Sequence, residues 1–231
     1  MRFHRLQNLI GSDKLDFLSG QHVMVFGLGG VGSFAAEALV RSGIGKLTVI
    51  DYDVVDITNI NRQLVALEST IGQYKVDVFY QRAKEINPDV DIKTYRLKAD
   101  EVNIKDLMAL SPDYILDCVD DVGAKIALVQ ASSQNHIPMI LAMGFANKFH
   151  PEMIEISTVS KTSVCPLAKA VRKQLRDMGL PLDIPCVFSK EKVATRIDER
   201  ILGSTAFCPS SAGLMMASYV INDLLKGGNN E

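Results

Sequence analysis

Residues 22–32 read HVMVFGLGGVG, an apolar run followed at once by a cluster of glycines. The run has the β-branched and aromatic residues of a buried strand, and the apolar residues after it recur at helical spacing. The glycines fit the pattern G-x-G-x-x-G, in which Gly27 permits a tight turn, Gly29 lets the backbone approach a phosphate, and Gly32 allows close packing of helix on sheet. Because the start of a helix offers free N–H donors to an anion, this stretch predicts a nucleotide site.

Strands and helices are expected to alternate on both sides of this stretch. Alternation of this kind indicates a mostly parallel sheet with right-handed crossovers. The predicted fold class is therefore α/β, a Rossmann-like, mostly parallel sheet flanked by helices, with a C-terminal lid or interface region. Strands are expected at 22–27, 47–51, 91–97, 114–118, 138–143 and 153–159 (the last at an edge or antiparallel), and helices at 31–42, 72–87, 123–135, 166–178 and 210–225.

The length of 231 residues, of which 47% are hydrophobic, fits one domain with a sizeable core. We expect a single domain over 1–231, with a nucleotide-binding core at 20–160, a lid or substrate segment at 161–205 and a closing helix at 206–226. The formal net charge of −2 gives no global attraction for nucleic acid, so such a partner needs a local basic patch.

Neither a secretory leader nor a membrane span is expected. The first residues have no apolar core, and the uncharged stretches are broken by polar residues and a proline, unlike a span of about 20 apolar residues. We therefore expect a cytoplasmic protein with no membrane partner. The four cysteines form no C-x-x-C pair, which excludes a zinc knuckle of paired cysteines.

A polar stretch, DYDVVDITNINRQ, follows the second strand at 51–63. Asp51 is placed to accept hydrogen bonds from ribose hydroxyls. The acids, amides and arginine after it suit a triphosphate better than a dinucleotide, because its outer phosphates need cations and amides. Arg62 and Lys75 are the expected phosphate ligands, and Asp120 is expected to hold Mg²⁺. The candidate residues for ATP are Gly27, Gly29, Gly30, Gly32, Asp51, Asp53, Asn59, Arg62, Gln63, Lys75, Asp120 and Asp121.

Five motifs of this sequence resemble those of the ATP-dependent activating enzymes related to the ubiquitin-activating enzyme, and they occur in the same order as in that family. The family includes the molybdopterin-synthase and thiamine-pathway adenylyltransferases. The resemblance implies that the glycines contact phosphate, that Asp51 contacts the ribose, and that Asp120 serves magnesium and the α-phosphate. It also implies that Arg62 and Lys75 contact the triphosphate. The motifs are GLGGVG at 27–32, DYD at 51–53, NINRQ at 59–63, GQYK at 72–75 and DCVDD at 117–121.

The same resemblance implies a homodimer, because in that family an arginine from the partner subunit's N-terminus reaches the γ-phosphate. Arg5 is the candidate for this catalytic role here, and Arg2 is the fallback.

The rest of the chain is similar to the branch of the family that dehydrates threonylcarbamoyladenosine in tRNA. This implies ATP-dependent cyclisation of N6-threonylcarbamoyladenosine at position 37 of tRNA, through adenylation of the threonyl carboxylate and release of AMP. A sulfur-transfer protein as a further partner is left open; for Cys186, structural packing is favoured over a catalytic or sulfur-handling role. The matching segments are 2–11, 161–176, 183–191 and 203–218.

A basic helix gives separate support for an RNA partner. From Pro166 onward, basic residues recur at i, i+3, i+4 and i+7, which predicts one positive stripe for a phosphate backbone. The residues are Lys169, Arg172, Lys173 and Arg176.

Three alternatives stay open. An adenylyltransferase for the C-terminus of a ubiquitin-like sulfur carrier is the main one, although such enzymes commonly carry two C-x-x-C pairs. An NAD-dependent oxidoreductase is favoured only by the glycine pattern. A non-catalytic scaffold is disfavoured because Arg62, Lys75 and Asp120 are all present.

Overall fold

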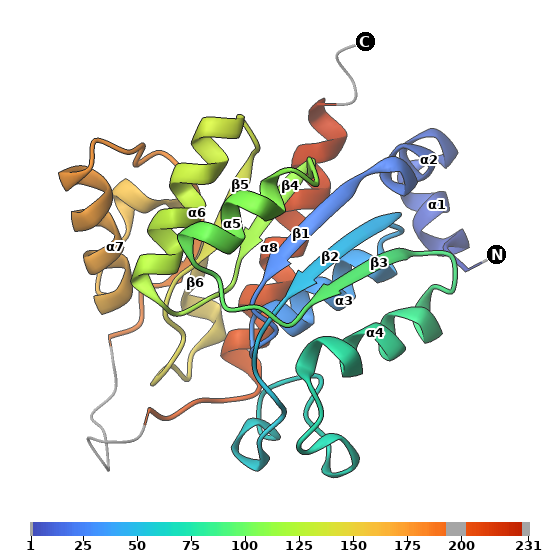
Figure 1. The fold of residues 1–231 in the computed structure, drawn as a ribbon, viewed down its shortest axis with the longest axis horizontal. Coiled ribbons are helices and arrows are strands. Elements are labelled where there is room, and N and C mark those ends of the chain that lie inside the picture. The colour runs from blue at the N-terminus through green and yellow to red at the C-terminus, as the bar shows by residue number, and fades with distance from the viewer. Residues whose placement is uncertain (1, 193–201, 228–231) are drawn as a thin grey trace.

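The computed structural model describes residues 2–192 and 202–227 and confirms the predicted α/β class. A seven-stranded sheet runs through the centre in the order β3-β2-β1-β4-β5-β7-β6 (Figure 1). All neighbouring strands are parallel except β6, which pairs antiparallel with β7 at one edge, as expected for 153–159. The strands are β1 (His22–Phe26), β2 (Lys46–Ile50), β3 (Asp91–Tyr95), β4 (Tyr114–Asp117), β5 (Met139–Ala142), β6 (Ile154–Thr158) and β7 (Pro185–Ser189).

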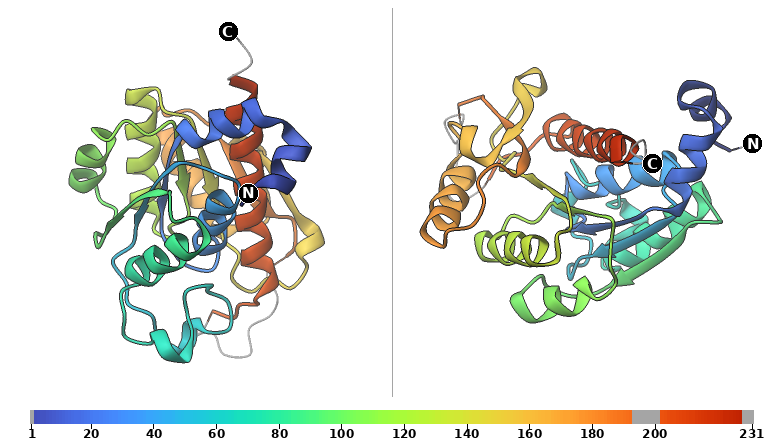
Figure 2. Two further views of the ribbon diagram at one scale, coloured as in Figure 1. Left: turned by 90° about the vertical axis from the view of Figure 1, so that its right-hand side faces the viewer. Right: turned by 90° about the horizontal axis from the view of Figure 1, so that it is seen from above.

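Helices cover both faces of the sheet (Figure 2). The apolar side chains of α3, α4 and α8 pack with one face in one core cluster, and those of α5, α6 and α7 pack with the other face in a second. In the described part of the chain no helix is both long and apolar enough to cross a membrane. The α-helices are α1 (His4–Ile10), α2 (Ser12–Gly20), α3 (Gly32–Arg41), α4 (Lys75–Ile86), α5 (Glu101–Met108), α6 (Val122–Asn135), α7 (Pro166–Asp177) and α8 (Phe207–Gly227).

The segment expected as a lid differs from its prediction. Within 161–205, β7 lies inside the sheet between β5 and β6, and most of its residues are buried. The reason is its composition, because PCVFS is an apolar run that can fill a strand position even though polar residues surround it. Residues 193–201 of the expected lid lie outside the described residues.

Helices α1, α2 and α5 were not predicted. Asp100 begins α5 by accepting a hydrogen bond from the Asn103 N–H, which is an N-cap of ordinary kind.

The strand order reverses direction between β1 and β4, since the chain goes from β1 outward to β2 and β3 and then returns to the other side of β1. Ligands of open parallel sheets bind at such a reversal, beyond the carboxyl ends of the strands. Three segments meet there, namely the glycine loop after β1, Asp51 after β2 and residues 118–121 after β4.

Candidate nucleotide-binding site

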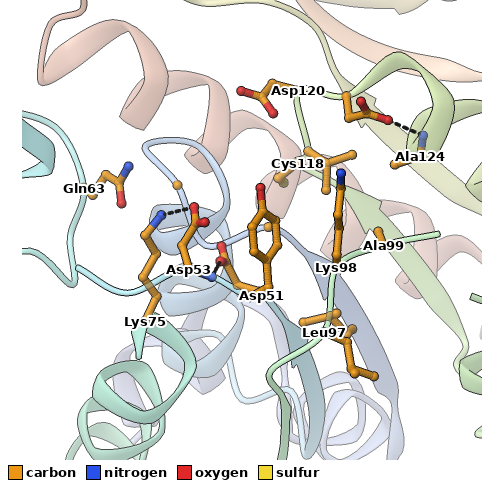
Figure 3. A pocket seen from close by; sticks show the side chains of 16 residues that line it. Asp51, Asp53, Gln63, Lys75, Leu97, Lys98, Ala99, Cys118, Asp120 and Ala124 are labelled. Carbon is orange, nitrogen blue, oxygen red and sulfur yellow. Dashed lines mark hydrogen bonds and ion pairs between the residues drawn. The ribbon is translucent and has the colours of Figure 1, made fainter. Parts of the chain in front are cut away.

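A pocket lies at the carboxyl ends of β1, β2 and β4 (Figure 3). It brings together most of the residues proposed for ATP, which come from parts of the chain far apart in sequence. Those that line it are Gly27, Gly29, Asp51, Asp53, Gln63, Lys75, Asp120 and Asp121. The other lining residues are Ile50, Tyr52, Leu97, Lys98, Ala99, Cys118, Val119 and Ala124.

The glycine loop is held by close backbone contacts. Gly27 has φ +89°, and a Cβ there would lie 2.9 Å from the carbonyl oxygen of Cys118. A Cβ on Gly32 would lie 1.8 Å from the carbonyl oxygen of Gly27. By contrast, a Cβ on Gly29 would meet only Gln63 Nε2, at 4.0 Å. Gly27 and Gly32 are therefore required by packing, whereas Gly29 leaves its side of the loop open to the pocket.

Asp51 ties the end of β2 to the glycine loop. Its carboxylate accepts hydrogen bonds from the backbone N–H of Leu28 at 2.6 Å and of Asp53 at 2.8 Å. Only 7% of the residue is exposed, and this burial raises the pKa of Asp51 above the usual range for an aspartate, although Lys75 opposes the shift. The carboxylate keeps the acceptor capacity that ribose hydroxyls would use.

Polar groups that would suit phosphates gather on one side of Asp51 (Figure 3). Lys75, at the start of α4, places its Nζ 2.8 Å from Asp53 Oδ2. Gln63 is buried beside them, and its Oε1 has no hydrogen-bond partner among the described residues. A buried amide oxygen needs a hydrogen-bond donor, and water or a ligand hydroxyl in the pocket can supply one.

Residues after β4 close the other side. Asp121 caps α6 by accepting a hydrogen bond from the Ala124 N–H at 2.8 Å. Asp120 lines the pocket, and no described residue donates a hydrogen bond to its carboxylate. Val119 and Leu97 add apolar surface to the pocket, of the kind an adenine ring needs.

Tyr52 lies within the DYD motif but was not proposed as a ligand, and no motif covers residues 97–99, although all four residues line the pocket. Residues 97–99 reach it because β3 pairs in parallel with β2, so the segment after β3 arrives at the same edge. The alternating pattern at 91–97 was the only available indication of this.

Four of the proposed ligands do not line the pocket, and two of them, Arg62 and Asn59, have polar side chains with partners elsewhere. The Arg62 guanidinium donates hydrogen bonds to the Thr58 carbonyl at 2.8 Å and to Asn61 Oδ1 at 2.9 Å. Asn59 Oδ1 accepts the backbone N–H of Asp56 in a capping box. The polar loop thus satisfies part of its own hydrogen bonding, which a sequence pattern cannot reveal.

Gly30 and Gly32 adjoin the pocket without lining it. Arg5 is exposed on α1, which together with α2 precedes the amino end of β1 (Figure 1). It is therefore at the opposite end of the strands from the pocket of its own chain.

The predicted positive stripe on α7 is interrupted. Lys169, Lys173 and Arg176 are exposed, as expected. Arg172 instead turns back and donates to the carbonyl oxygen of Thr162 at 2.8 Å and to its hydroxyl. Its charge is used to hold the helix against the preceding turn.

Two cysteines lie in surroundings that do not favour a reactive thiolate. Cys186 is fully buried in β7, and burial raises its pKa to about 12, so it stays a protonated thiol. This favours the packing role over sulfur chemistry. Cys118 lines the pocket, and burial raises the pKa of its thiol as well.

Comparison with known proteins gives the family. The model of the ThiF family matches residues 3–231. The tRNA threonylcarbamoyladenosine dehydratase of Bacillus subtilis (strain 168) is 40% identical, with 97% of this chain and 95% of that protein covered. The crystal structure of the Escherichia coli tRNA N6-threonylcarbamoyladenosine dehydratase in complex with ATP superposes with a TM-score of 0.94 at 32% identity, covering 100% of this chain and 96% of the other.

Similarity to the sulfur-carrier class is narrower. The molybdopterin-synthase adenylyltransferase of Escherichia coli (strain K12) is 31% identical, and the match covers 61% of this chain and 57% of that protein. The match to the family model, by contrast, extends over nearly all of the sequence, and the chain belongs to the ThiF family.

Proposed function

We propose that this protein is an ATP-dependent enzyme that dehydrates N6-threonylcarbamoyladenosine at position 37 of tRNA. It adenylates the threonyl carboxylate, and ring closure then expels AMP. The relatives named for this activity match almost the whole chain, and the sulfur-carrier alternative matches a smaller part.

The observation that carries the proposal is the composition of the pocket. Apolar surface from Val119 and Leu97 suits adenine, the carboxylate of Asp51 suits ribose, and Lys75 with the open side of Gly29 suits phosphates. Gln63 lies on the phosphate side, where its side-chain N–H groups can donate to phosphate oxygens and its unpartnered Oε1 can accept a hydrogen bond from water.

The chemistry requires activation, because a carboxylate has no good leaving group. Joining it to the α-phosphate makes AMP the leaving group, and pyrophosphate departs. The carbamoyl group then attacks the same carbonyl carbon from within the molecule, so orientation supplies much of the rate. Lys75 and the N–H groups at the start of α3 stabilise the negative charge on the phosphates.

Asp120 would hold a magnesium ion on the phosphates. Its carboxylate faces the pocket, no described residue donates a hydrogen bond to it, and a carboxylate oxygen is a preferred ligand for Mg²⁺. The ion would supply further neutralisation of phosphate charge.

Arg62 would need to leave the Thr58 carbonyl to reach a phosphate. Its Cγ is only 3.5 Å from the Cβ position of Gly30, so a rotation about its outer bonds brings the guanidinium to the glycine loop.

The active form is proposed to be a homodimer in which Arg5 enters the partner's pocket. Support comes from the position of α1 beyond the amino ends of the strands, from which Arg5 cannot serve its own pocket. The outward side of α8 offers apolar surface for contact, since Leu214 is 51% exposed, and Ile156 on edge strand β6 is 37% exposed.

The tRNA backbone is proposed to contact the exposed cations of α7. Enzymes that act on tRNA work where tRNA is used, and on that ground we propose a cytoplasmic location. The sulfur-transfer partner stays a prediction from the resemblance.

The decisive experiment incubates the protein with ATP, Mg²⁺ and tRNA that carries threonylcarbamoyladenosine. Nucleoside mass spectrometry should show loss of one water from the modified nucleoside, with AMP and pyrophosphate released. The Lys75→Met variant is the control for a contaminating activity. If the modified nucleoside is unchanged after incubation of the wild-type protein with ATP, Mg²⁺ and the tRNA, the proposal is refuted.

Pyrophosphate exchange distinguishes the main alternative. Exchange that a small sulfur-carrier protein stimulates, and that modified tRNA does not, would favour an adenylyltransferase of that class. Tight binding of NADH without binding of ATP would favour an oxidoreductase.

A further inference from the structure

A buried ion pair lies directly behind the pocket. Lys125 on α6 and Asp117 at the end of β4 have 0% exposed side chains, and their Nζ and Oδ2 atoms are 2.9 Å apart. Lys125 Nζ also donates to the carbonyl oxygen of Ala142, at the carboxyl end of β5, at 2.7 Å. The lysine thus joins the carboxyl ends of two neighbouring strands.

The same aspartate shapes the turn that carries Asp120. Its second oxygen, Oδ1, accepts the backbone N–H of Val119 at 3.1 Å. Residues 118–121 of this turn line the pocket, and Asp121 caps the helix to which Lys125 belongs. A change in the position of Asp117 would therefore move one wall of the pocket.

The turn has little room to move, because it lies against the glycine loop. A Cβ on Gly27 would meet the Cys118 carbonyl oxygen at 2.9 Å, and a Cβ on Gly32 would meet the Cys118 Cβ at 3.0 Å. The glycine loop and the turn after β4, which both line the pocket, are therefore packed against each other.

An ion pair taken out of water gains little stability over apolar residues of similar size, because desolvation offsets the attraction. A fully buried pair beside a ligand pocket therefore suggests a role besides stability. We propose that Lys125, through Asp117, is a positioning residue that holds the turn after β4 so that the Asp120 carboxylate faces the magnesium–nucleotide complex. This inference rests on the role of Asp120 in the proposed function.

The test is a double-mutant cycle read out by nucleotide binding. Isothermal titration with ATP, with and without Mg²⁺, is applied to Lys125→Met, Asp120→Asn and the combined variant. If Lys125 acts through Asp120, Lys125→Met weakens Mg²⁺-dependent ATP binding by about tenfold, as losses of supporting contacts commonly do, and the combined variant is no weaker than Asp120→Asn alone. Binding of ATP without Mg²⁺ changes by less than about twofold in both single variants.

Lys148→Met is the matched control. Lys148 is also buried, at 3% exposure, but its Nζ donates to the Glu191 carbonyl and the residue does not line the pocket. The control should lower the melting temperature without changing the dependence of ATP binding on Mg²⁺. Multiplication of the Lys125→Met and Asp120→Asn effects, or an effect of Lys125→Met no larger than that of Lys148→Met, would overturn the proposal.

A second variant separates positioning from stability. Asp117→Asn combined with Lys125→Met removes both charges and keeps an acceptor for the Val119 N–H. We expect it to recover the melting temperature and to keep the loss of Mg²⁺-dependent binding, because the link to Ala142 is absent. Recovery of both quantities would mean a purely structural pair.

If Lys125→Met does not fold, the Asp117→Asn variant is measured in its place. We expect it to lose Mg²⁺-dependent ATP binding to a smaller extent. The absence of any loss would overturn the proposal. Because the readout is nucleotide binding, a failure of this inference can be told apart from a failure of the wild-type protein to convert tRNA.

Discussion

Lys75 and Asp53 form an ion pair at the pocket in which the cation is buried and the anion is not. The Nζ–Oδ2 distance is 2.8 Å, and the exposed side-chain fractions are 5% for the lysine and 45% for the aspartate. A triphosphate carries more negative charge than the carboxylate, so it can share or take over the ammonium without a rearrangement of α4.

The Lys75→Met variant should therefore bind ATP more weakly by about 2 kcal/mol, or roughly thirtyfold in Kd, since a hydrogen bond to a charged group is lost. Its stability should change little, because the Asp53 carboxylate is 45% exposed and can be solvated by water once the ammonium group is absent. Titration calorimetry with ATP measures the loss, and Lys105→Met on the exposed side of α5 is the control. An ATP affinity equal to that of the control would show that Lys75 does not serve the phosphates.

Substitution of Gly29 and of Gly32 by alanine is expected to affect different properties, ATP binding in the first case and stability in the second. The Gly32→Ala methyl group would lie 1.8 Å from the Gly27 carbonyl oxygen, so this variant should lose about 3 kcal/mol of unfolding free energy or more. Gly29→Ala meets nothing closer than 4.0 Å and should keep its melting temperature. It should nevertheless bind ATP at least about tenfold more weakly, because the methyl group occupies space that a phosphate would use. Denaturant unfolding and calorimetry measure both effects, and equal losses of stability in the two variants would contradict this division.

The sequence predicted the parts of the site that depend on local chemistry. The turn at Gly27, the packing at Gly32, and the positions of Asp51 and Lys75 follow from backbone geometry and charge over short stretches. Parts that depend on tertiary partners were missed. Lys125, on a helix, reads as a solvated side chain until Asp117 is placed beside it by the β4–α6 turn.

Hydrogen bonds within the polar loop explain why two proposed ligands do not line the pocket in this structure. Asn59 and Arg62 were assigned to phosphates for their chemistry, but each finds a partner within its own loop. Strand β7 was missed because its short apolar run, PCVFS, begins with a proline and lies among polar residues, so its pattern resembles that of a loop.

Asp51 makes nucleoside binding sensitive to acid. Burial raises the pKa of its carboxyl group, and ribose hydroxyls need the ionised form as acceptor. Affinity is therefore full above this raised pKa and is lost as the pH falls through it, at a higher pH than for an exposed aspartate. Adenosine, which has no phosphate to titrate, is the appropriate ligand for Kd measurements from neutral to acidic pH. The Asp51→Asn variant should bind weakly with no such acidic loss; an identical pH profile in the variant would assign the effect to another group.

The cations of α7 can be tested separately from the arginine that anchors the helix. Reversal of Lys169, Lys173 and Arg176 to glutamate should weaken tRNA binding and make the slope of log K against log salt shallower by about 1 per lost phosphate contact, because fewer counterions are released. ATP affinity should stay as in the wild type. Reversal of the exposed Lys14 on α2 is the control for net charge.

The Arg172→Ala variant should behave differently, since it removes hydrogen bonds to the carbonyl and hydroxyl oxygens of Thr162. We expect a lower melting temperature and, in the fraction that stays folded, a salt slope close to that of the wild type. Filter binding at several salt concentrations gives both slopes. A slope that changes with Arg172 and not with the three exposed cations would move the RNA contact from the outer face of α7 to the turn at Thr162.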